Sequence, residues 1–163
     1  MDEYINLHKD HPKSYHSYMQ DTLFIHIDIV HHSVHLLNGK AEDLEKECDI
    51  YEENNKKVGC SYLFIGGIWP DGRIAFNEPD SSLVLRIRVK TLEEDTILAN
   101  SRFLGGNMES VLKQALTVGD GTVMDAQEVM VLIMGSHKAL TLTMAIEEGI
   151  NHMCTVSVFL QHP

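Results

Sequence analysis

The stretch that most constrains the fold of this chain is residues 60–79, which read CSYLFIGGIWPDGRIAFNEP. A short apolar run at residues 62–65 ends at a glycine pair, and a tight turn formed by Pro70, Asp71 and Gly72 follows. The run is rich in aromatic and aliphatic residues and is bounded by glycine, so it predicts a buried strand. In open α/β sheets, the ends of such strands are where ligands bind.

Two carboxylates follow this strand, Asp71 in the turn and Glu78 after the apolar residues 74–76. A pair of carboxylates at a strand's end can carry acid–base chemistry when their surroundings push their pKa values apart. The alternative is a turn aspartate and a glutamate that caps a helix or is solvated. The residues alone leave both interpretations open.

The rest of the chain alternates helical and strand patterns, which predicts an α/β fold with a mostly parallel sheet and helices packed on its faces. We expect one domain over residues 1–163. Helices are predicted at 15–23 (with Ser14 as N-cap), 43–57, 91–103, 124–127 and 137–148. Strands are predicted at 62–65, 115–118, 129–134 and 155–160, a strand or a strand-like connection at 24–30, and a strand or an extended segment at 81–92. Tyr15, Tyr18, Met19 and Leu23 recur at helical spacing, which indicates core packing.

Composition excludes several classes of protein. The net charge of −11 argues against a nucleic-acid partner, although it permits a small anion held by local cations. No apolar run reaches the ~18 residues of a membrane span, and the charged N-terminus is unlike a signal peptide. The cysteines number three, without CxxC spacing, which is typical of reduced thiols in a cytoplasmic protein.

Two basic patterns could bind an anion. Residues 135–138 read GSHK at the junction of a predicted strand and helix, where backbone N–H groups and Lys138 could hold a phosphate, with Arg102 as a second cation. The alternative is a surface lysine and a solvated arginine. Arg86 and Arg88, with Lys90, alternate with apolar residues, as in a strand with its cations on one side or a charged exposed edge.

His31, His32 and His35 could place imidazoles on one face of a helix, as in a metal site. No cysteine or acidic residue lies beside them, so we expect solvated histidines and no metal.

The segment DGRIAFNEP resembles the DGHIAFNEP of the glucosamine-6-phosphate deaminase (isomerase) family. The likeness extends along the chain through MDEY, HPKSYHSYM, LLNGKAEDLEKEC, DTILANSRF, ALTVGDGTVMDAQEVM and AIEEGINHMCTVSVFLQHP. The resemblance implies a Rossmann-like fold. It also implies an enzyme that converts glucosamine 6-phosphate and water into fructose 6-phosphate and ammonia, without metal or organic cofactor. The resemblance further implies a homo-oligomer, which in the family is a hexamer. Family chains continue beyond both ends of this sequence, so we expect the first strands of the family fold to lie outside it.

The resemblance assigns roles to individual residues. Asp2 matches the family's proton-transferring base, and Asp71 and Glu78 match the acids that flank a ring-opening histidine. Arg102 and Lys138 match the cations that bind the sugar phosphate, assisted in the family by an upstream Gly-Gly-Ser/Thr-Pro loop that is missing from this sequence. Further residues match an allosteric site for an amino-sugar phosphate between subunits: Ser81, Arg88, Lys90 and Thr91.

The position of the ring-opening histidine holds Arg73. A histidine near its free pKa of about 6.5 both accepts and donates a proton, whereas an arginine stays protonated. We expect Arg73 to form a static ion pair between Asp71 and Glu78, and ring opening to lose the roughly 10²–10⁴-fold contribution of a general acid–base group. Asp2, next to the terminus, is expected to fray. The sequence therefore predicts a deaminase with impaired catalysis, or alternatively a non-catalytic sugar-phosphate-binding or assembly protein.

Three smaller departures accompany Arg73. Trp69 replaces a glycine of the family's GxGP, Asp120 places a charge in an apolar turn, and Cys154 replaces a tryptophan, which predicts a cavity.

Overall fold

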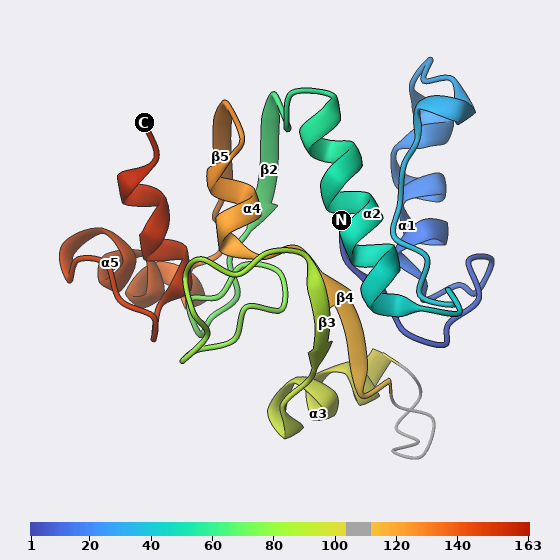
Figure 1. The fold of residues 1–163 in the computed structure, drawn as a ribbon. Coiled ribbons are helices and arrows are strands. Elements are labelled where there is room, and N and C mark those ends of the chain that lie inside the picture. The colour runs from blue at the N-terminus through green and yellow to red at the C-terminus, as the bar shows by residue number, and fades with distance from the viewer. Residues whose placement is uncertain (104–111) are drawn as a thin grey trace. The chain divides into compact units, whose positions relative to one another are not determined.

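The computed structural model describes residues 1–103 and 112–163, with the backbone alone at residues 99–103 (Figure 1). A loop predicted at Gly105, Gly106 and Asn107 lies outside the described residues. The chain divides into two compact units, each built from two segments. The first unit contains Met1–Cys48 and Val89–Thr117, and the second contains Asp49–Arg88 and Val118–Pro163.

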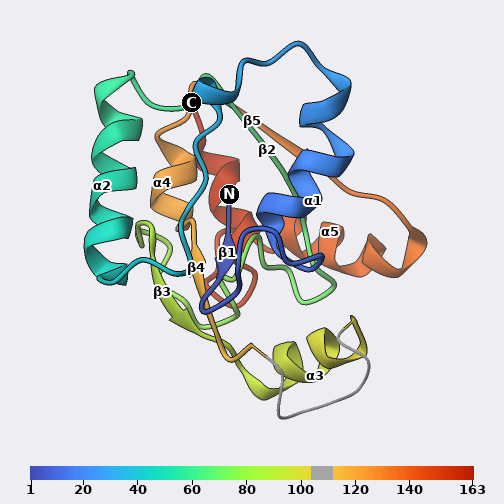
Figure 2. The ribbon, with the colours of Figure 1, turned by 90° about the vertical axis from the view of Figure 1, so that its right-hand side faces the viewer.

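The first unit is organised around a three-stranded sheet of order β1-β4-β3. Its strands are β1 (Glu3–Tyr4), β3 (Arg88–Thr91) and β4 (Gln114–Thr117), and a helix α3 (Glu94–Phe103) follows β3. β1 pairs antiparallel with β4 (Figure 2), so the N-terminal residues form a strand that the sequence did not indicate. β3 is shorter than the strand or extended segment predicted at 81–92, and the last three residues of β4, Ala115, Leu116 and Thr117, are fully buried.

Helix α1 (Tyr15–Thr22) begins where the sequence predicts. Ser14 is its N-cap, and the Ser14 hydroxyl accepts a hydrogen bond from the Ser17 backbone N–H at 3.0 Å. The expected core packing of its apolar stripe is wrong, because the helix has no buried residue and Tyr18 is 56% exposed. Tyr15 stacks instead on Tyr4 of β1, with ring centroids 5.6 Å apart.

Residues 24–30, expected to form a strand or a strand-like connection, do not form a strand. Short 3-10 helices form there, η1 (Phe24–His26) and η2 (His31–Ser33), and the three histidines His31, His32 and His35 are exposed. Ile25, Ile27 and Val30 are mostly exposed as well, so the partial alternation of this segment does not reflect a sheet with one buried face.

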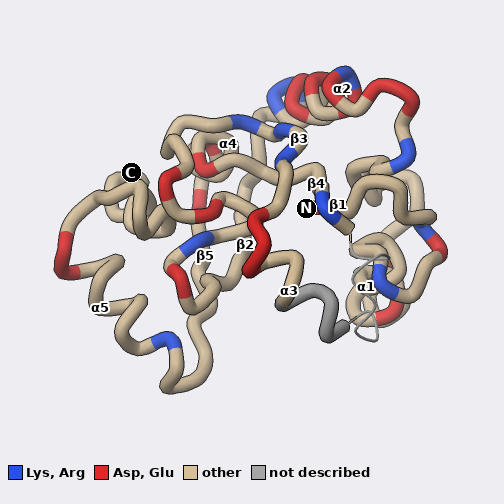
Figure 3. The backbone as a smooth tube through the Cα atoms, turned by 90° about the horizontal axis from the view of Figure 1, so that it is seen from below, with Lys and Arg blue, Asp and Glu red and all other residues tan. Residues whose placement is uncertain are grey.

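Helix α2 (Leu44–Lys57) spans the division between the units and confirms the prediction for residues 43–57. Acidic and basic residues recur along its length (Figure 3). Asp43 accepts a hydrogen bond from the Lys46 backbone N–H at 3.0 Å, which caps the first turn.

The second unit contains a two-stranded parallel sheet formed by β2 (Leu63–Gly67) and β5 (Glu128–Leu132), which lie side by side in Figure 1. This parallel pair, together with the surrounding helices, confirms the α/β class. Both strands were expected to be buried, but each has one exposed face because exposure alternates along them. That face carries Ile65, Met130 and Leu132, which are about half exposed.

The remaining elements of the second unit are helical: α4 (Asp120–Met124), η4 (Ser136–Lys138), α5 (Ala139–Glu147) and η5 (Thr155–Gln161). α4 lies earlier than the turn predicted at 124–127. Gly149, with φ +78°, follows α5 as the sequence predicts. The strand predicted at 155–160 is wrong, because residues 155–158 are all buried in succession on a 3-10 helix. Its Val156 joins Ile68, Ala145 and Cys154 in a buried apolar cluster.

Within residues 1–103 and 112–163, no helix has the length and apolar character needed to cross a membrane.

Candidate active site

The candidate site is built on a tight turn after β2. The backbone N–H of Trp69 donates to the Arg73 carbonyl and that of Gly72 donates to the Trp69 carbonyl, each at 3.0 Å. Gly72 has φ +84°, and a Cβ there would lie 2.6 Å from the Cys154 sulfur, so the turn requires glycine on both grounds. Ile68 and Ile74, both buried, flank the turn as an isolated antiparallel bridge and fix it to the core.

Arg73 lies between the two carboxylates, as the sequence predicts. Its Nη1 is 3.4 Å from Asp71 Oδ2 and 3.4 Å from Glu78 Oε1. The three environments differ, because the Arg73 side chain is 5% exposed, that of Glu78 is fully buried and that of Asp71 is 40% exposed. The backbone N–H of Arg73 also donates to Asp71 Oδ1 at 3.3 Å. The cation is thus neutralised by groups of its own loop.

Trp69 completes the enclosure of Arg73. The guanidinium carbon lies 4.7 Å from the centre of the Trp69 ring, a cation–π contact. From the sequence, Trp69 was expected to block the close approach that a glycine at this position allows. In the structure, the tryptophan and the arginine, which both depart from the family pattern, pack against each other.

Asn77 holds the backbone next to Glu78. The Asn77 side-chain Nδ2 donates to the backbone carbonyls of Ile74 at 3.1 Å and Val118 at 2.9 Å. The backbone carbonyl of Asn77 accepts a hydrogen bond from Thr155 Oγ1 at 3.1 Å. Asn77 is fully buried. These contacts make Asn77 a positioning residue for Glu78, a role that the sequence reasoning missed because nothing in the motif distinguishes an anchoring amide from a solvated one.

Asp120 is a fully buried carboxyl at the first residue of α4. Its Oδ1 lies 3.4 Å from Asn77 Nδ2, and its Oδ2 has no hydrogen-bond partner among the described residues. Burial raises the pKa of Asp120 from 3.8 to about 7, against the opposing attraction of Arg88. The charge expected in an apolar turn is therefore present as a carboxyl that ionises near neutral pH.

Cys154, expected to leave a cavity, is buried against the turn. It is 3% exposed, and its Sγ lies 3.9 Å from the Gly72 carbonyl oxygen. Burial raises the pKa of the Cys154 thiol.

Asp2 belongs to the first unit, whereas Asp71, Arg73 and Glu78 belong to the second. The Asp2 carboxylate accepts a hydrogen bond from Thr117 Oγ1 at 3.1 Å, and the next residue begins β1. The expected fraying at Asp2 is thus opposed by the β1–β4 pairing and by this side-chain contact.

The two predicted phosphate ligands are described unequally. Arg102 lies in α3, and its side chain is outside the described residues. Lys138 is half-buried at the N-cap of α5. Three residues later, Thr141 Oγ1 donates to the Pro70 carbonyl at 2.5 Å, so the start of α5 is held against the turn that carries Asp71.

The predicted allosteric residues lie in and before β3. Arg88, Lys90 and Thr91 are on the strand itself, and Ser81 donates its backbone N–H to the Glu78 carbonyl at 3.1 Å. Arg86, by contrast, is not an exposed edge cation. It forms ion pairs with Asp125, at 2.6 Å, and with Glu52, and donates to the Gly121 carbonyl at 2.7 Å. Burial lowers the pKa of Arg86, but the two acidic partners raise it by more, so the net shift of this pKa is upward.

Known proteins resemble this chain strongly, although no family model matches it. Glucosamine-6-phosphate deaminase 1 of Bos taurus and of Homo sapiens are each 62% identical over 163 residues. The alignments cover 100% of this chain and 56% of theirs, so the chain spans just over half the length of these curated relatives. The deaminase of Aedes aegypti is 61% identical, with 59% of its length covered.

Solved structures give the same result for the fold. A monomeric glucosamine-6-phosphate deaminase of the NagB superfamily superposes with a TM-score of 0.93 at 38% identity, covering 100% of this chain and 67% of that one. The 6-phosphogluconolactonase of Trypanosoma cruzi shares the fold, with a TM-score of 0.73 at 16% identity over 99% of this chain and 64% of that one. With this identity and structural agreement, the chain belongs to the glucosamine-6-phosphate deaminase family.

Proposed function

We propose that this chain binds glucosamine 6-phosphate and converts it, with water, into fructose 6-phosphate and ammonia at a strongly reduced rate. The observation that carries the proposal is the placement of Arg73 between Asp71 and Glu78. The acids of the family motif are in place, and the group between them has changed from a titrating ring to a fixed cation.

The reaction has two proton-transfer requirements. Asp2 is the base that moves a proton between carbons 1 and 2 of the open sugar, which isomerises the aldose to the ketose before the amine leaves as ammonia. The hydrogen bond from Thr117 orients the Asp2 carboxylate for this step. Opening the pyranose ring requires a second group that donates a proton to the ring oxygen, and this is where the chain departs from its relatives.

Arg73 cannot serve as that second group. An arginine stays protonated, and here the guanidinium is further held by two carboxylates and the Trp69 ring. Cyclic substrate therefore opens only by its uncatalysed route, while substrate already in the open form reaches Asp2. Lys138, at the start of a helix tied to the Pro70 carbonyl, is the proposed phosphate ligand in this unit, and Arg102 is the second.

The same arrangement supports a second candidate, a non-catalytic sugar-phosphate-binding or assembly protein. The ion pairs of Arg73 remove the proton relay, and Lys138, the proposed phosphate ligand, takes part in neither of them. Under this alternative the ligand binds without turnover.

Ammonia release from glucosamine 6-phosphate distinguishes the two candidates. The test compares the unaltered chain with Arg73→His and with the double variant Trp69→Gly/Arg73→His, which restores both family residues. We expect the double variant to gain about 10²-fold or more in rate. Arg73→Gln is the matched control, because it removes the cation without supplying a titrating group, and it should gain nothing.

Failure of the double variant to release ammonia, together with a rise in melting temperature on adding glucosamine 6-phosphate, would favour binding alone. Absence of both responses would contradict the proposed substrate.

We further propose that Ser81, Arg88, Lys90 and Thr91 bind an amino-sugar phosphate effector in a cytoplasmic homo-oligomer. Light scattering with and without glucosamine 6-phosphate tests this assembly, and a mass that stays monomeric under both conditions contradicts it.

A further inference from the structure

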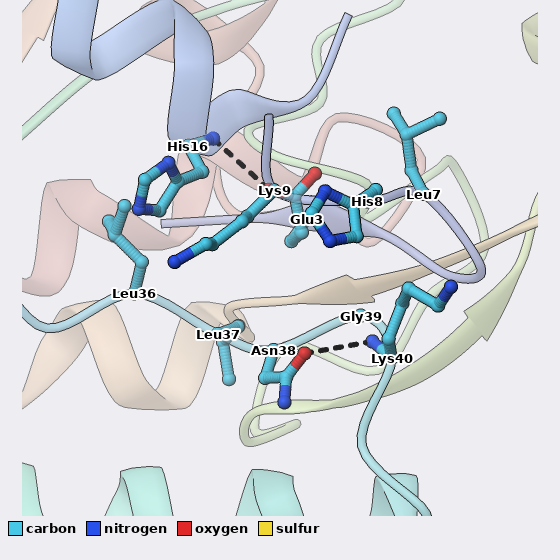
Figure 4. Close-up of a pocket in the computed structure, with 10 residues that line it drawn as sticks. All are labelled: Glu3, Leu7, His8, Lys9, His16, Leu36, Leu37, Asn38, Gly39 and Lys40. Carbon is cyan, nitrogen blue, oxygen red and sulfur yellow. Dashed lines mark hydrogen bonds between the residues drawn. The ribbon is translucent and has the colours of Figure 1, made fainter. Parts of the chain in front are cut away.

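The first unit contains a pocket that none of the roles above uses. It has a volume of about 500 Å³ and lies between the loop after β1, the first turn of α1 and residues 36–40 (Figure 4). Three leucines form its apolar part. The side chains of His8, Lys9, His16 and Lys40 supply nitrogen to its lining.

The two lysines of this pocket have no ion pair with any residue that the structure describes. Lys9 and Lys40 are exposed, and in the view of Figure 4 their ammonium groups lie to either side of the Glu3 side chain. The chain as a whole carries a net charge of −11, so two lysines that line one pocket without an acidic partner among the described residues stand out from its surface.

The carboxylate in the lining does not neutralise these lysines directly. Glu3 is buried, and its Oε1 accepts backbone N–H bonds from Tyr4 at 2.8 Å and Tyr15 at 3.1 Å, while its Oε2 accepts from His16 at 3.1 Å. Two of these donors belong to the first turn of α1, where the helix dipole favours a negative charge. The Glu3 carboxylate is therefore committed to the backbone.

The other side-chain oxygen of the lining is engaged too. Asn38 Oδ1 accepts from the Lys40 backbone N–H at 3.0 Å, which leaves the Asn38 amide N–H₂ to donate. The Asp10 backbone nitrogen lies 3.3 Å from His8 Nδ1. The exposed Asp10 carboxylate also lies 3.3 Å from His8 Nδ1. The side chains thus offer the pocket donors and cations.

We infer that this pocket binds a small phosphate monoester. A lining whose side-chain oxygens are already satisfied and whose lysines have no ion pair to a described residue favours an anionic ligand. The double negative charge of a phosphate monoester suits a pocket with a lysine on either side, and the leucines contact the carbon body of the ester. Because both lysines are exposed, binding is weak and falls as ionic strength rises.

Calorimetric titration with phenyl phosphate tests this inference without reference to catalysis. The double variant Lys9→Gln/Lys40→Gln should bind phenyl phosphate about tenfold more weakly. Lys46→Gln, which removes an exposed lysine of the same unit outside the pocket, is the matched control and should bind as the unaltered chain does. Lys138→Gln separates this pocket from the proposed substrate site, and it should leave the part of the binding that Lys9→Gln/Lys40→Gln removes unchanged.

Two further ligands sharpen the result. Benzyl alcohol, which has the apolar body without the charge, should bind undetectably, and benzoate, with a single charge, should bind more weakly than phenyl phosphate. Equal affinity of the double lysine variant and the unaltered chain, with both melting at the same temperature, would overturn the inference. So would an equal loss in Lys46→Gln, because that result indicates attraction to surface charge in general.

Discussion

Arg73 and the pair Lys9 and Lys40 present cations in opposite ways. Arg73 is buried, lies 3.4 Å from each of two carboxylates and faces an aromatic ring. Lys9 and Lys40 are exposed, and the nearby carboxylate of Glu3 is occupied by backbone N–H groups. A cation that the protein neutralises itself contributes to stability but not to ligand binding. A cation whose potential partner is engaged elsewhere remains available to an external anion.

Asp120 extends this comparison to a fully buried carboxyl, with one oxygen 3.4 Å from Asn77 Nδ2 and the other without a hydrogen-bond partner among the described residues. Because its pKa is raised from 3.8 to about 7, the folded protein resists ionisation of this group, and stability present at low pH is lost as pH rises through about 7. The shift corresponds to no more than about 4 kcal/mol. Chemical denaturation at pH 5 and pH 8 should show this loss in the unaltered chain and not in Asp120→Asn. Parallel curves for the two proteins would contradict it.

Glu78 and Asp71 provide a matched pair of acids at the same distance from Arg73 but with different burial. Glu78→Gln leaves a buried guanidinium with one exposed partner, and we expect a loss of about 3 kcal/mol in the free energy of unfolding. Asp71→Asn removes a partly exposed acid and should cost about 1 kcal/mol or less. Urea denaturation measures both. A larger loss for Asp71→Asn would show that burial does not decide the strength of these pairs.

The contact between Trp69 and Arg73 should appear as a coupling free energy. A double-mutant cycle with Trp69→Leu and Arg73→Met is expected to give about 1–2 kcal/mol, because the guanidinium is largely removed from water. Urea denaturation of the four proteins supplies the cycle. If the two losses simply add, the ring and the cation are neighbours without a favourable interaction.

The smallest effect is expected for the pocket lysines. Lys9→Gln/Lys40→Gln should change the free energy of unfolding by less than about 0.5 kcal/mol, since neither side chain has an ion pair to a described residue. Thermal unfolding is a sufficient measurement. A clear destabilisation would show that these lysines support the fold, and it would remove the contrast with Arg73.

The parts of the fold that the sequence predicted well are those set by local chemistry. Ser14 caps α1, residues 44–57 form the charged helix, and the turn at residues 70–72 follows a strand. The ion pair of Arg73 followed from the family resemblance, which identified Asp71 and Glu78 as the acids on either side of the position that Arg73 occupies. None of these features depends on distant segments of the chain.

The failures come from tertiary context. Residues 155–158 contain valine and threonine, which favour strands, but four successive residues are buried there and no pairing partner is present among the described strands. Tyr18 has helical spacing and yet is 56% exposed. The contact of Trp69 with Arg73 required the geometry of the turn, and the burial of Asp120 required the position of α4, neither of which periodicity reports.

Cys154 gives the turn a built-in chemical reporter. The buried thiol lies against the Gly72 carbonyl, and its raised pKa keeps it in the unreactive protonated form. A thiol reagent reaches this sulfur only when the turn lifts away, so the rate of alkylation at Cys154, followed by mass spectrometry of the peptide, counts the opening events of the loop that carries Arg73.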